Sequence, residues 1–251
     1  MEPCSNNWVM TSEKRGTTHE DQGFVLHTTP WRETSLVVEV LTPHNGRISL
    51  VAKGVRRPRA ALRGVLQPFQ PLHLVWYGQE GLRILKSAEW QGGQPLLQGR
   101  ALFCGFYLNE LLFRMVVPED NQELLFESYG RALFRLALEP TQEPILRTFE
   151  YELLQSLGVA PVLDRESLTN LPVVAEVLYG LDRDGAVVRL GPGQENAVQC
   201  HGKTLLDMAK GNYGDPRSAQ ECKRVMRWLL QVHLGGQELH TRRILQEIPT
   251  L

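Results

Sequence analysis

Five short runs rich in β-branched and aromatic residues follow one another between residues 23 and 90. This succession constrains the fold more than any other feature of the sequence. The runs are GFVLHTT, SLVVEVLT, GRISLVAKG, PLHLVWYG and GLRILKSAEW, with glycine and proline at the corners. Runs of this length and composition are typical of strands. We predict that they pair in an antiparallel manner and close into a small barrel, because closure removes the exposed edges of a sheet.

The dipeptide Asn45-Gly46 lies between the second and third runs. Both residue types tolerate the positive φ angles of a tight turn, so this pair is a strong hairpin signal. After it, Ile48 and Leu50 alternate with Ser49 and Val51. Such alternation predicts a strand with one buried face and one more exposed face.

After QGGQP at 91–95, a stretch whose glycines and proline interrupt regular structure, the apolar residues recur at helical spacing. We predict helices over 96–117, 121–138, 143–158, 203–210, 217–234 and 241–247, with a small hairpin in LDRDGAVVRL. The fold class is therefore α+β, with the barrel first and the helices second. The expected organisation is a flexible tail over 1–22, a barrel over 23–92, and a helical domain over 93–251 that carries an irregular insertion around 160–202.

A dense group of cations lies in the first half of the chain. The stretch from residue 40 to residue 79 holds no carboxylate, and its cations are Arg47, Lys53, Arg56, Arg57, Arg59 and Arg63. The whole chain has 27 basic and 28 acidic side chains, so the acids exceed the bases elsewhere. Solubilising surfaces usually mix the two signs. A segment of this kind on a barrel loop favours contact with nucleic-acid phosphates, although a plain solvated surface is the alternative.

Neighbouring aromatic residues admit two interpretations. Phe69, Trp76 and Tyr77 are candidates for stacking on bases, but they also suit a barrel core. Core packing is favoured for Trp76, which shares a face with Leu72 and Leu74. A second basic group, Lys223, Arg224 and Arg227, lies in the helix expected over 217–234 and is either ordinary solvation or a supplementary DNA contact.

No constellation of catalytic or metal-binding residues is visible. HGKT at 201–204 lacks the glycine that a phosphate-binding loop requires, and the histidines show no ligand spacing. The four cysteines form no CxxC pair, so we expect reduced thiols and neither a metal nor a cofactor. No run reaches the roughly 20 apolar residues of a membrane span, and the polar N-terminus has no secretory pattern. We therefore expect a non-enzymatic cytoplasmic protein, associated with the nucleoid and not with a membrane.

Several segments together resemble the bacterial RecO family of DNA repair proteins. They are GFVLHTTPWRETSLVVEVLTPHNGRISLVAKGVRR, LQPFQPL, LKSAEW, GFYLNELLFRMV, LRTFEYELLQSLG and HLGGQELHTRRIL, which occur in matching order over roughly residues 23–247. The resemblance implies an N-terminal oligonucleotide-binding (OB) barrel and a helical C-terminal domain. It also implies a recombination mediator that binds single- and double-stranded DNA, anneals complementary strands and, with RecR, helps RecA to load on DNA coated by single-strand-binding protein.

The resemblance also carries expectations for particular residues. Some family members hold zinc through four cysteines in the helical domain, but GVAPVLDRESLTNLPV contains none, so we expect a metal-free version. The acidic, apolar C-terminal tail of single-strand-binding protein is expected to dock on the helical domain, with Arg147 as the cation and Leu124 and Phe126 as a groove wall. A surface arginine and core packing are the alternatives. A different class of function, a protein-binding adaptor whose basic loop grips acidic tails, also remains open.

Overall fold

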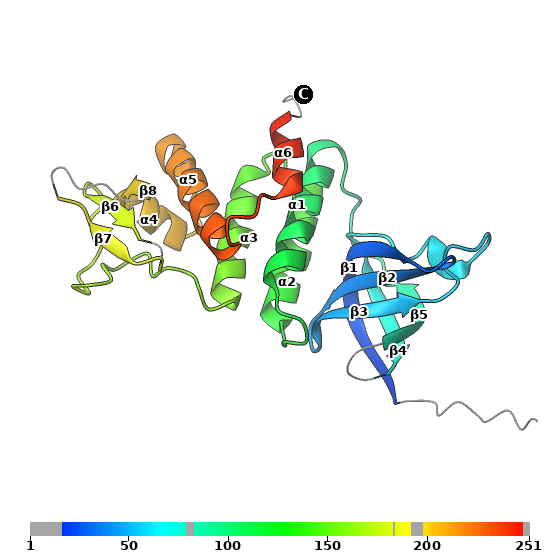
Figure 1. The fold of residues 1–251 in the computed structure, drawn as a ribbon. Coiled ribbons are helices and arrows are strands. Elements are labelled where there is room, and N and C mark those ends of the chain that lie inside the picture. The colour runs from blue at the N-terminus through cyan, green and yellow to red at the C-terminus, as the bar shows by residue number, and fades with distance from the viewer. Residues whose placement is uncertain (1–16, 79–82, 183, 192–197, 248–251) are drawn as a thin grey trace, which may run out of the picture.

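The barrel is closed and has five strands. The computed structural model describes residues 17–78, 83–182, 184–191 and 198–247, and Figure 1 shows the barrel beside a group of helices. The strands are β1 (Thr18–Trp31), β2 (Ser35–Thr42), β3 (Gly46–Ala52), β4 (Pro71–Tyr77) and β5 (Arg83–Trp90). They pair in the order β1-β2-β3-β5-β4, with β1 also paired to β4. The OB barrel is thus confirmed, except that β3 and β5 pair in parallel.

The hairpin expected at Asn45-Gly46 is present between β2 and β3. Gly46 has a φ of +62°, and a Cβ at this position would lie 1.8 Å from the carbonyl oxygen of Asp120. Glycine is therefore required both by the backbone conformation and by the close approach of the segment between the first two helices. The same segment is tied to the turn by hydrogen bonds, including one from the backbone N–H of Gln122 to the carbonyl oxygen of Pro43 (3.1 Å).

The expectation of a flexible tail over 1–22 is wrong for its last five residues. Residues 1–16 lie outside the described residues, but residues 18–22 form the start of β1 and pair with β4. The inward-facing side chains of residues 18–22 are polar. The alternation of apolar and polar residues that predicts a strand is therefore absent from this segment. His19 stacks on Trp76, and buried Asp21 accepts hydrogen bonds from the backbone N–H of His44 and from the amide of Asn45. Asp21 therefore stabilises the hairpin.

In the described part of the chain six helices follow the barrel, close to the ranges expected from the sequence. They are α1 (Gly99–Met115), α2 (Glu123–Leu138), α3 (Glu143–Ser156), α4 (Gly202–Ala209), α5 (Pro216–His233) and α6 (His240–Glu247). In Figure 1, α1 and α2 lie next to the barrel, and α5 and α4 lie progressively farther from it. None of the helices in the described parts of the chain is long and apolar enough to cross a membrane.

A small three-stranded sheet occupies part of the irregular insertion. The expected hairpin is present as β6 (Leu178–Leu181) and β7 (Val187–Arg189), and β8 (Val198–His201) adds a third strand on the other side of β6. No sequence pattern predicted β8, which has only four residues. Directly after it, α4 begins at Gly202, so HGKT starts a helix as expected. The cysteines at 104, 200 and 222 are buried free thiols, and Cys4 lies outside the described range.

Glu221 of α5 holds the small sheet and α4 together. Its carboxylate accepts hydrogen bonds from the Thr204 hydroxyl (2.6 Å) and from the backbone N–H of His201 (2.8 Å). Burial alone would raise the pKa of Glu221. The hydrogen bonds from Thr204 and His201 outweigh burial and lower this pKa to about 2. The ionised carboxylate is therefore a stabilising part of the fold.

One apolar cluster joins the barrel to the helices, and a second cluster fills the interior of the barrel. Phe24, Leu26 and Leu41 of the barrel belong to the same cluster as the buried residues of α1, α2 and α3. Within this interface β1 shifts register between Val25 and His27 relative to β2, which is a bulge. The side-chain amide of buried Asn109, on α1, donates to the carbonyl oxygens of Val25 (3.3 Å) and Leu26 (3.0 Å). The Tyr129 hydroxyl of α2 in turn donates to Asn109. These bonds fasten the helices to the bulge.

Replacing Asn109 by leucine should lower the stability of the protein. Asn109→Leu leaves two buried carbonyls and the Tyr129 hydroxyl without their partner, and we expect a loss of about 1–3 kcal/mol in the free energy of unfolding, measured by urea denaturation. Leu124→Ala is the control, because Leu124 is 78% exposed and its loss should cost less than about 0.5 kcal/mol. Equal losses in the two variants would contradict this role for Asn109.

The stability of the protein should fall in acid because of Glu221. A carboxyl group with a lowered pKa in the folded state contributes stability that is complete above its unfolded pKa and is lost as the pH falls toward its folded pKa. Between pH 5 and pH 2.5 we expect wild type to lose more stability than Glu221→Gln, by on the order of 1–3 kcal/mol. Glu127→Gln, at an exposed position on α2, should behave like wild type. Parallel curves for wild type and Glu221→Gln would refute the assignment.

Candidate nucleic-acid interface

The segment that joins β3 to β4 carries the dense group of cations. Lys53, Arg56, Arg57, Arg59 and Arg63 are all exposed, and among the described residues none of the five has a carboxylate oxygen within 4.0 Å. We call these five residues the basic segment. Its backbone is ordered by short-range hydrogen bonds and by one bond from the N–H of Arg56 to the carbonyl oxygen of Thr34 (2.9 Å). The structure therefore presents unneutralised cations on an anchored loop.

Arg47 is different from the five residues of the basic segment. Its side chain is only 16% exposed, and its Nη1 donates to Glu39 Oε2 at 2.9 Å. Its Nε donates to the carbonyl oxygen of Val116 (3.0 Å), and its guanidinium lies 5.3 Å from the ring centre of Phe113. Arg47 thus joins the barrel to the end of α1. Because its charge is already paired, we remove Arg47 from the expected DNA contacts.

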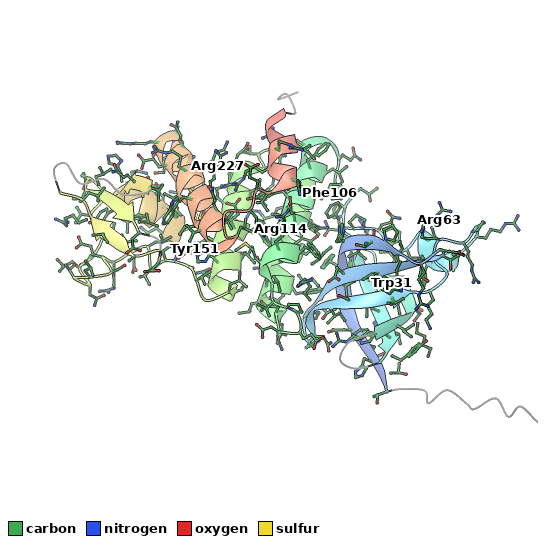
Figure 2. The ribbon with its side chains drawn as sticks, viewed as in Figure 1. Trp31, Arg63, Phe106, Arg114, Tyr151 and Arg227 are labelled. Carbon is green, nitrogen blue, oxygen red and sulfur yellow. The ribbon has the colours of Figure 1, made fainter. Side chains whose placement is uncertain are left out.

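The second basic group lies on a separate surface. Figure 2 shows Arg63 on the barrel and Arg227 on α5, well apart in the view. Lys223, Arg224 and Arg227 are exposed, and Arg224 is 4.0 Å from Glu221. Lys223 and Arg227 line a small pocket of about 90 Å³ with three further cations from other helices, which are Arg100, Arg147 and Arg242. The helices α1, α3 and α6 bring Arg100, Arg147 and Arg242 to the cations of α5 from distant positions in the sequence.

Arg147 is largely buried and already paired. Its side chain is 11% exposed and lies 2.8 Å from Oε1 of Glu150, which is completely buried. The Tyr107 hydroxyl donates to the same oxygen (2.6 Å). Burial tends to lower the pKa of Arg147, but the Glu150 carboxylate outweighs that effect and the pKa is raised. Arg147 is thus a charged residue held in place, with part of its side chain at the edge of two pockets.

Leu124 and Phe126 are not brought together with Arg147. A four-residue connection joins α2 to α3, so the two helices are antiparallel and their first turns lie at opposite ends. Leu124 points into solvent, and the ring centre of Phe126 lies 5.1 Å from that of Phe24 in the barrel. The expected groove wall is therefore wrong. A pocket of about 340 Å³ beside Arg147 is lined instead by Thr141, Glu143, Pro144, Tyr213, Ala219, Gln220 and Lys223.

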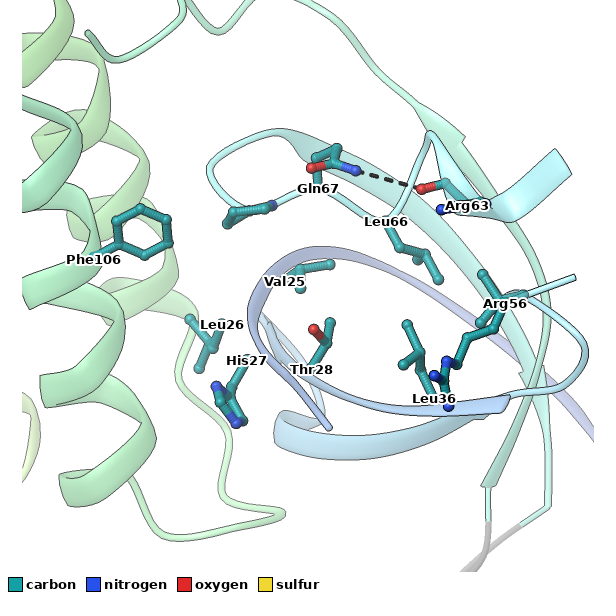
Figure 3. Close-up of a pocket in the computed structure, with 12 residues that line it drawn as sticks. Val25, Leu26, His27, Thr28, Leu36, Arg56, Arg63, Leu66, Gln67 and Phe106 are labelled. Atoms are coloured by element: carbon teal, nitrogen blue, oxygen red, sulfur yellow. Dashed lines mark hydrogen bonds between the residues drawn. The ribbon is translucent and has the colours of Figure 1, made fainter. Parts of the chain in front are cut away.

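A larger cleft lies between the barrel and α1, next to the basic segment. Its volume is about 580 Å³, and we call it the barrel–helix cleft. Figure 3 shows its walls, which come from β1, from the start of β2, from the connection between β3 and β4, and from α1. Its lining residues are Val25, Leu26, His27, Thr28, Leu36, Val55, Arg56, Arg63, Leu66, Gln67, Pro68 and Phe106. Two cations of the basic segment thus border a partly apolar hollow.

The exposed aromatic residues are not those expected from the sequence. Phe69 and Trp76 are buried, so core packing was the correct alternative for both, and Tyr77 is half-buried. Instead Trp31, Trp90 and Phe106 are exposed. Phe106 belongs to a helix that is apolar on most sides, and no local signal separates it from the core residues around it. Among the described residues, no group of three or more His, Cys, Asp and Glu side chains is arranged to hold a metal ion.

Comparisons with known proteins agree with this architecture. The family model described as "Recombination protein O N terminal" matches residues 17–93, and the model described as "Recombination protein O C terminal" matches residues 96–243. The chain is similar to the DNA repair protein RecO of Aromatoleum aromaticum, with 47% identity over 92% of this chain and 97% of that protein. It is also similar to the RecO proteins of Dechloromonas aromatica (46% identity, 91% and 95% covered) and Nitrosospira multiformis (46% identity, 91% and 95% covered).

Proposed function

The chain belongs to the recombination protein O family and has that family's role in DNA repair and recombination, and from this premise we propose that it is a DNA-annealing recombination mediator. In this proposal it binds single- and double-stranded DNA through the basic segment, anneals complementary strands, and acts with RecR to help RecA load on DNA coated by single-strand-binding protein. The observation that carries the proposal is the presence of five exposed cations that have no carboxylate partner among the described residues.

Electrostatics supply a physical route to annealing. Two DNA strands repel each other through their phosphates, and cations that neutralise phosphates release condensed counterions. Unpaired arginines are suited to this task because they have no competing intramolecular carboxylate to leave. Base pairing then supplies the free energy of annealing, so the proposed activity requires no covalent step, metal or cofactor. Such a protein would work in the cytoplasm, at the nucleoid.

The pocket beside Arg147 is the proposed docking site for the acidic tail of single-strand-binding protein. Such a tail needs an apolar surface and a cation for its terminal carboxylate. Pro144, Tyr213 and Ala219 line the pocket, and Arg147 and Lys223 supply the positive charge. This proposal replaces the groove of Leu124 and Phe126. It also separates tail binding on the helices from DNA binding at the barrel.

Removing three cations of the basic segment should weaken DNA binding. For Arg56/Arg57/Arg59→Ala we expect weaker binding of a labelled single-stranded oligonucleotide and a salt slope smaller by about 2, since each phosphate contact contributes about 0.7 for single strands. Fluorescence anisotropy over a salt titration measures both quantities. The matched control is Arg131/Arg165/Lys210→Ala, which removes the same charge from exposed positions outside the barrel and should leave the slope unchanged.

Two outcomes of this experiment would contradict the proposal. If both triple variants change binding equally, net charge alone governs the affinity. If wild type fails to bind oligonucleotide at low salt but still binds an acidic peptide, the chain is a protein-binding adaptor whose basic segment grips acidic tails.

Tail binding should depend on Lys223 but not on Leu124. Lys223→Ala removes an exposed cation of the pocket, and we expect the Kd for a labelled acidic peptide with an apolar C-terminus to rise about tenfold, because one charge-assisted hydrogen bond contributes about 1.5–3 kcal/mol. Leu124→Ala should leave this Kd unchanged, and weaker binding by that variant would place the tail on α2. Arg147 is a poor test residue because its removal leaves Glu150 buried without its cation.

A further inference from the structure

We propose that the barrel–helix cleft receives one unstacked nucleobase of single-stranded DNA. In this arrangement Phe106 stacks on the base, while Arg56 and Arg63, at the other end of the cleft, hold neighbouring phosphates of the strand. The inference rests on the proposed DNA-binding function and adds to it a defined site and a preference for single strands. Four features of the cleft support it, namely its rigid walls, the exposure of Phe106, its charge, and its size.

The walls of the cleft are held by bonds between distant parts of the chain. One wall is the bulged part of β1, whose carbonyls at Val25 and Leu26 accept from Asn109 of α1. The opposite wall is α1 itself. A Cβ at Gly105 would lie 2.9 Å from the Phe69 ring, which shows how closely α1 approaches the segment that leads into β4. The cleft is therefore preorganised, which lowers the entropic cost of binding.

Phe106 lies where it can stack on a bound base. It precedes Asn109 by three residues, so the two side chains lie on the same face of α1. Its ring meets that of buried Phe69 edge-on, with 4.9 Å between ring centres and 70° between ring planes. This contact fixes the ring, yet Phe106 remains 40% exposed and lines the cleft. Figure 3 shows it on α1, facing Leu26 and Gln67 across the hollow.

The charge of the cleft complements a nucleotide strand. Arg56 and Arg63 border it, and in the described part of the chain no carboxylate lies within 4.0 Å of either. The remaining polar lining comes from His27, Thr28 and Gln67, which can hydrogen-bond to a base edge. No aspartate or glutamate lines the cleft. A positively charged groove combined with an aromatic ring is the arrangement with which proteins bind single strands irrespective of sequence.

The size of the cleft restricts what can enter it. A volume of about 580 Å³ lies within the range of pockets that bind small molecules, and it suits one nucleotide but not a duplex. In duplex DNA the bases stay stacked and paired, so Phe106 can reach a base only in a single strand. We therefore expect duplex DNA to contact the basic segment alone. Single strands should contact both the basic segment and Phe106.

The test compares single-stranded and duplex DNA of the same length with wild type, Phe106→Leu and Phe106→Trp. Phe106→Leu keeps apolar packing against Phe69 but removes the aromatic face. We expect its affinity for a labelled single-stranded oligonucleotide to fall about tenfold, and its affinity for duplex to change less than about twofold. Phe106→Trp should retain single-strand binding. Phe134→Leu is the matched control, an exposed phenylalanine on α2 outside the cleft, and should bind both DNAs like wild type.

A second readout locates the base directly. A single-stranded oligonucleotide that carries 5-iododeoxyuridine is irradiated with the wild-type protein, and the crosslinked peptide is mapped. A crosslink at Phe106 supports the proposal, and crosslinks confined to other peptides overturn it. Thermal unfolding followed by circular dichroism must show that the variants are folded at the assay temperature.

Failure of this inference can be distinguished from failure of the proposed function. If Phe106→Leu binds single strands like wild type while the triple arginine variant binds weakly, the cleft holds no base but the basic segment still binds DNA. If Phe106→Leu loses single-strand and duplex binding equally, Phe106 only positions the basic segment, and the inference is overturned. If wild type binds neither DNA, both proposals fail. Binding of an acidic peptide that is lost in Phe106→Leu would assign the cleft to a protein partner and overturn the inference.

Discussion

The hydrogen bonds from Asn109 to the bulge of β1 determine how the two halves of this protein fit together. A bulge interrupts the ladder between strands and leaves backbone groups without a strand partner. When such carbonyls are buried they need another donor, because an unpaired buried acceptor costs about 1–3 kcal/mol. The amide of Asn109 supplies that donor for Val25 and Leu26. As a consequence α1 must lie against this side of the barrel, and Phe24 and Leu41 become part of the helical core.

Burial separates the cations of this protein into two groups with different roles. Arg47 and Arg147 are largely buried, and each has a carboxylate within 3 Å, as a desolvated charge requires. The cations of the basic segment are exposed and hydrated, so they need no fixed partner and are available for a polyanion. Arginine occurs in both groups. What differs is whether α1 or another helix covers the side chain.

The sequence predicted the barrel and the helices well, but it failed where local patterns were atypical. Asn45-Gly46 identified the hairpin because its conformational requirement is local to the turn. Residues 18–22 were missed because the inward-facing residues His19 and Asp21 are polar, and their partners are Trp76, His44 and Asn45. The groove wall of Leu124 and Phe126 was wrong because adjacency along the chain does not show which end of α2 faces Arg147.

The sequence by itself determined the order of strands and helices. It also determined that the segment between residues 40 and 79 has many cations and no carboxylate. These are properties of consecutive residues, since periodicity and charge depend on near neighbours in the chain. Only the tertiary structure decided which cations are paired, and it alone brought Phe106 and Arg56 to the walls of one cleft and Lys223 and Arg147 to the lining of one pocket. The physical reason is that these neighbours are 50 to 76 residues apart in sequence. Their proximity depends on the packing of α1 on the β1 bulge and of α3 on α5, which no local pattern encodes.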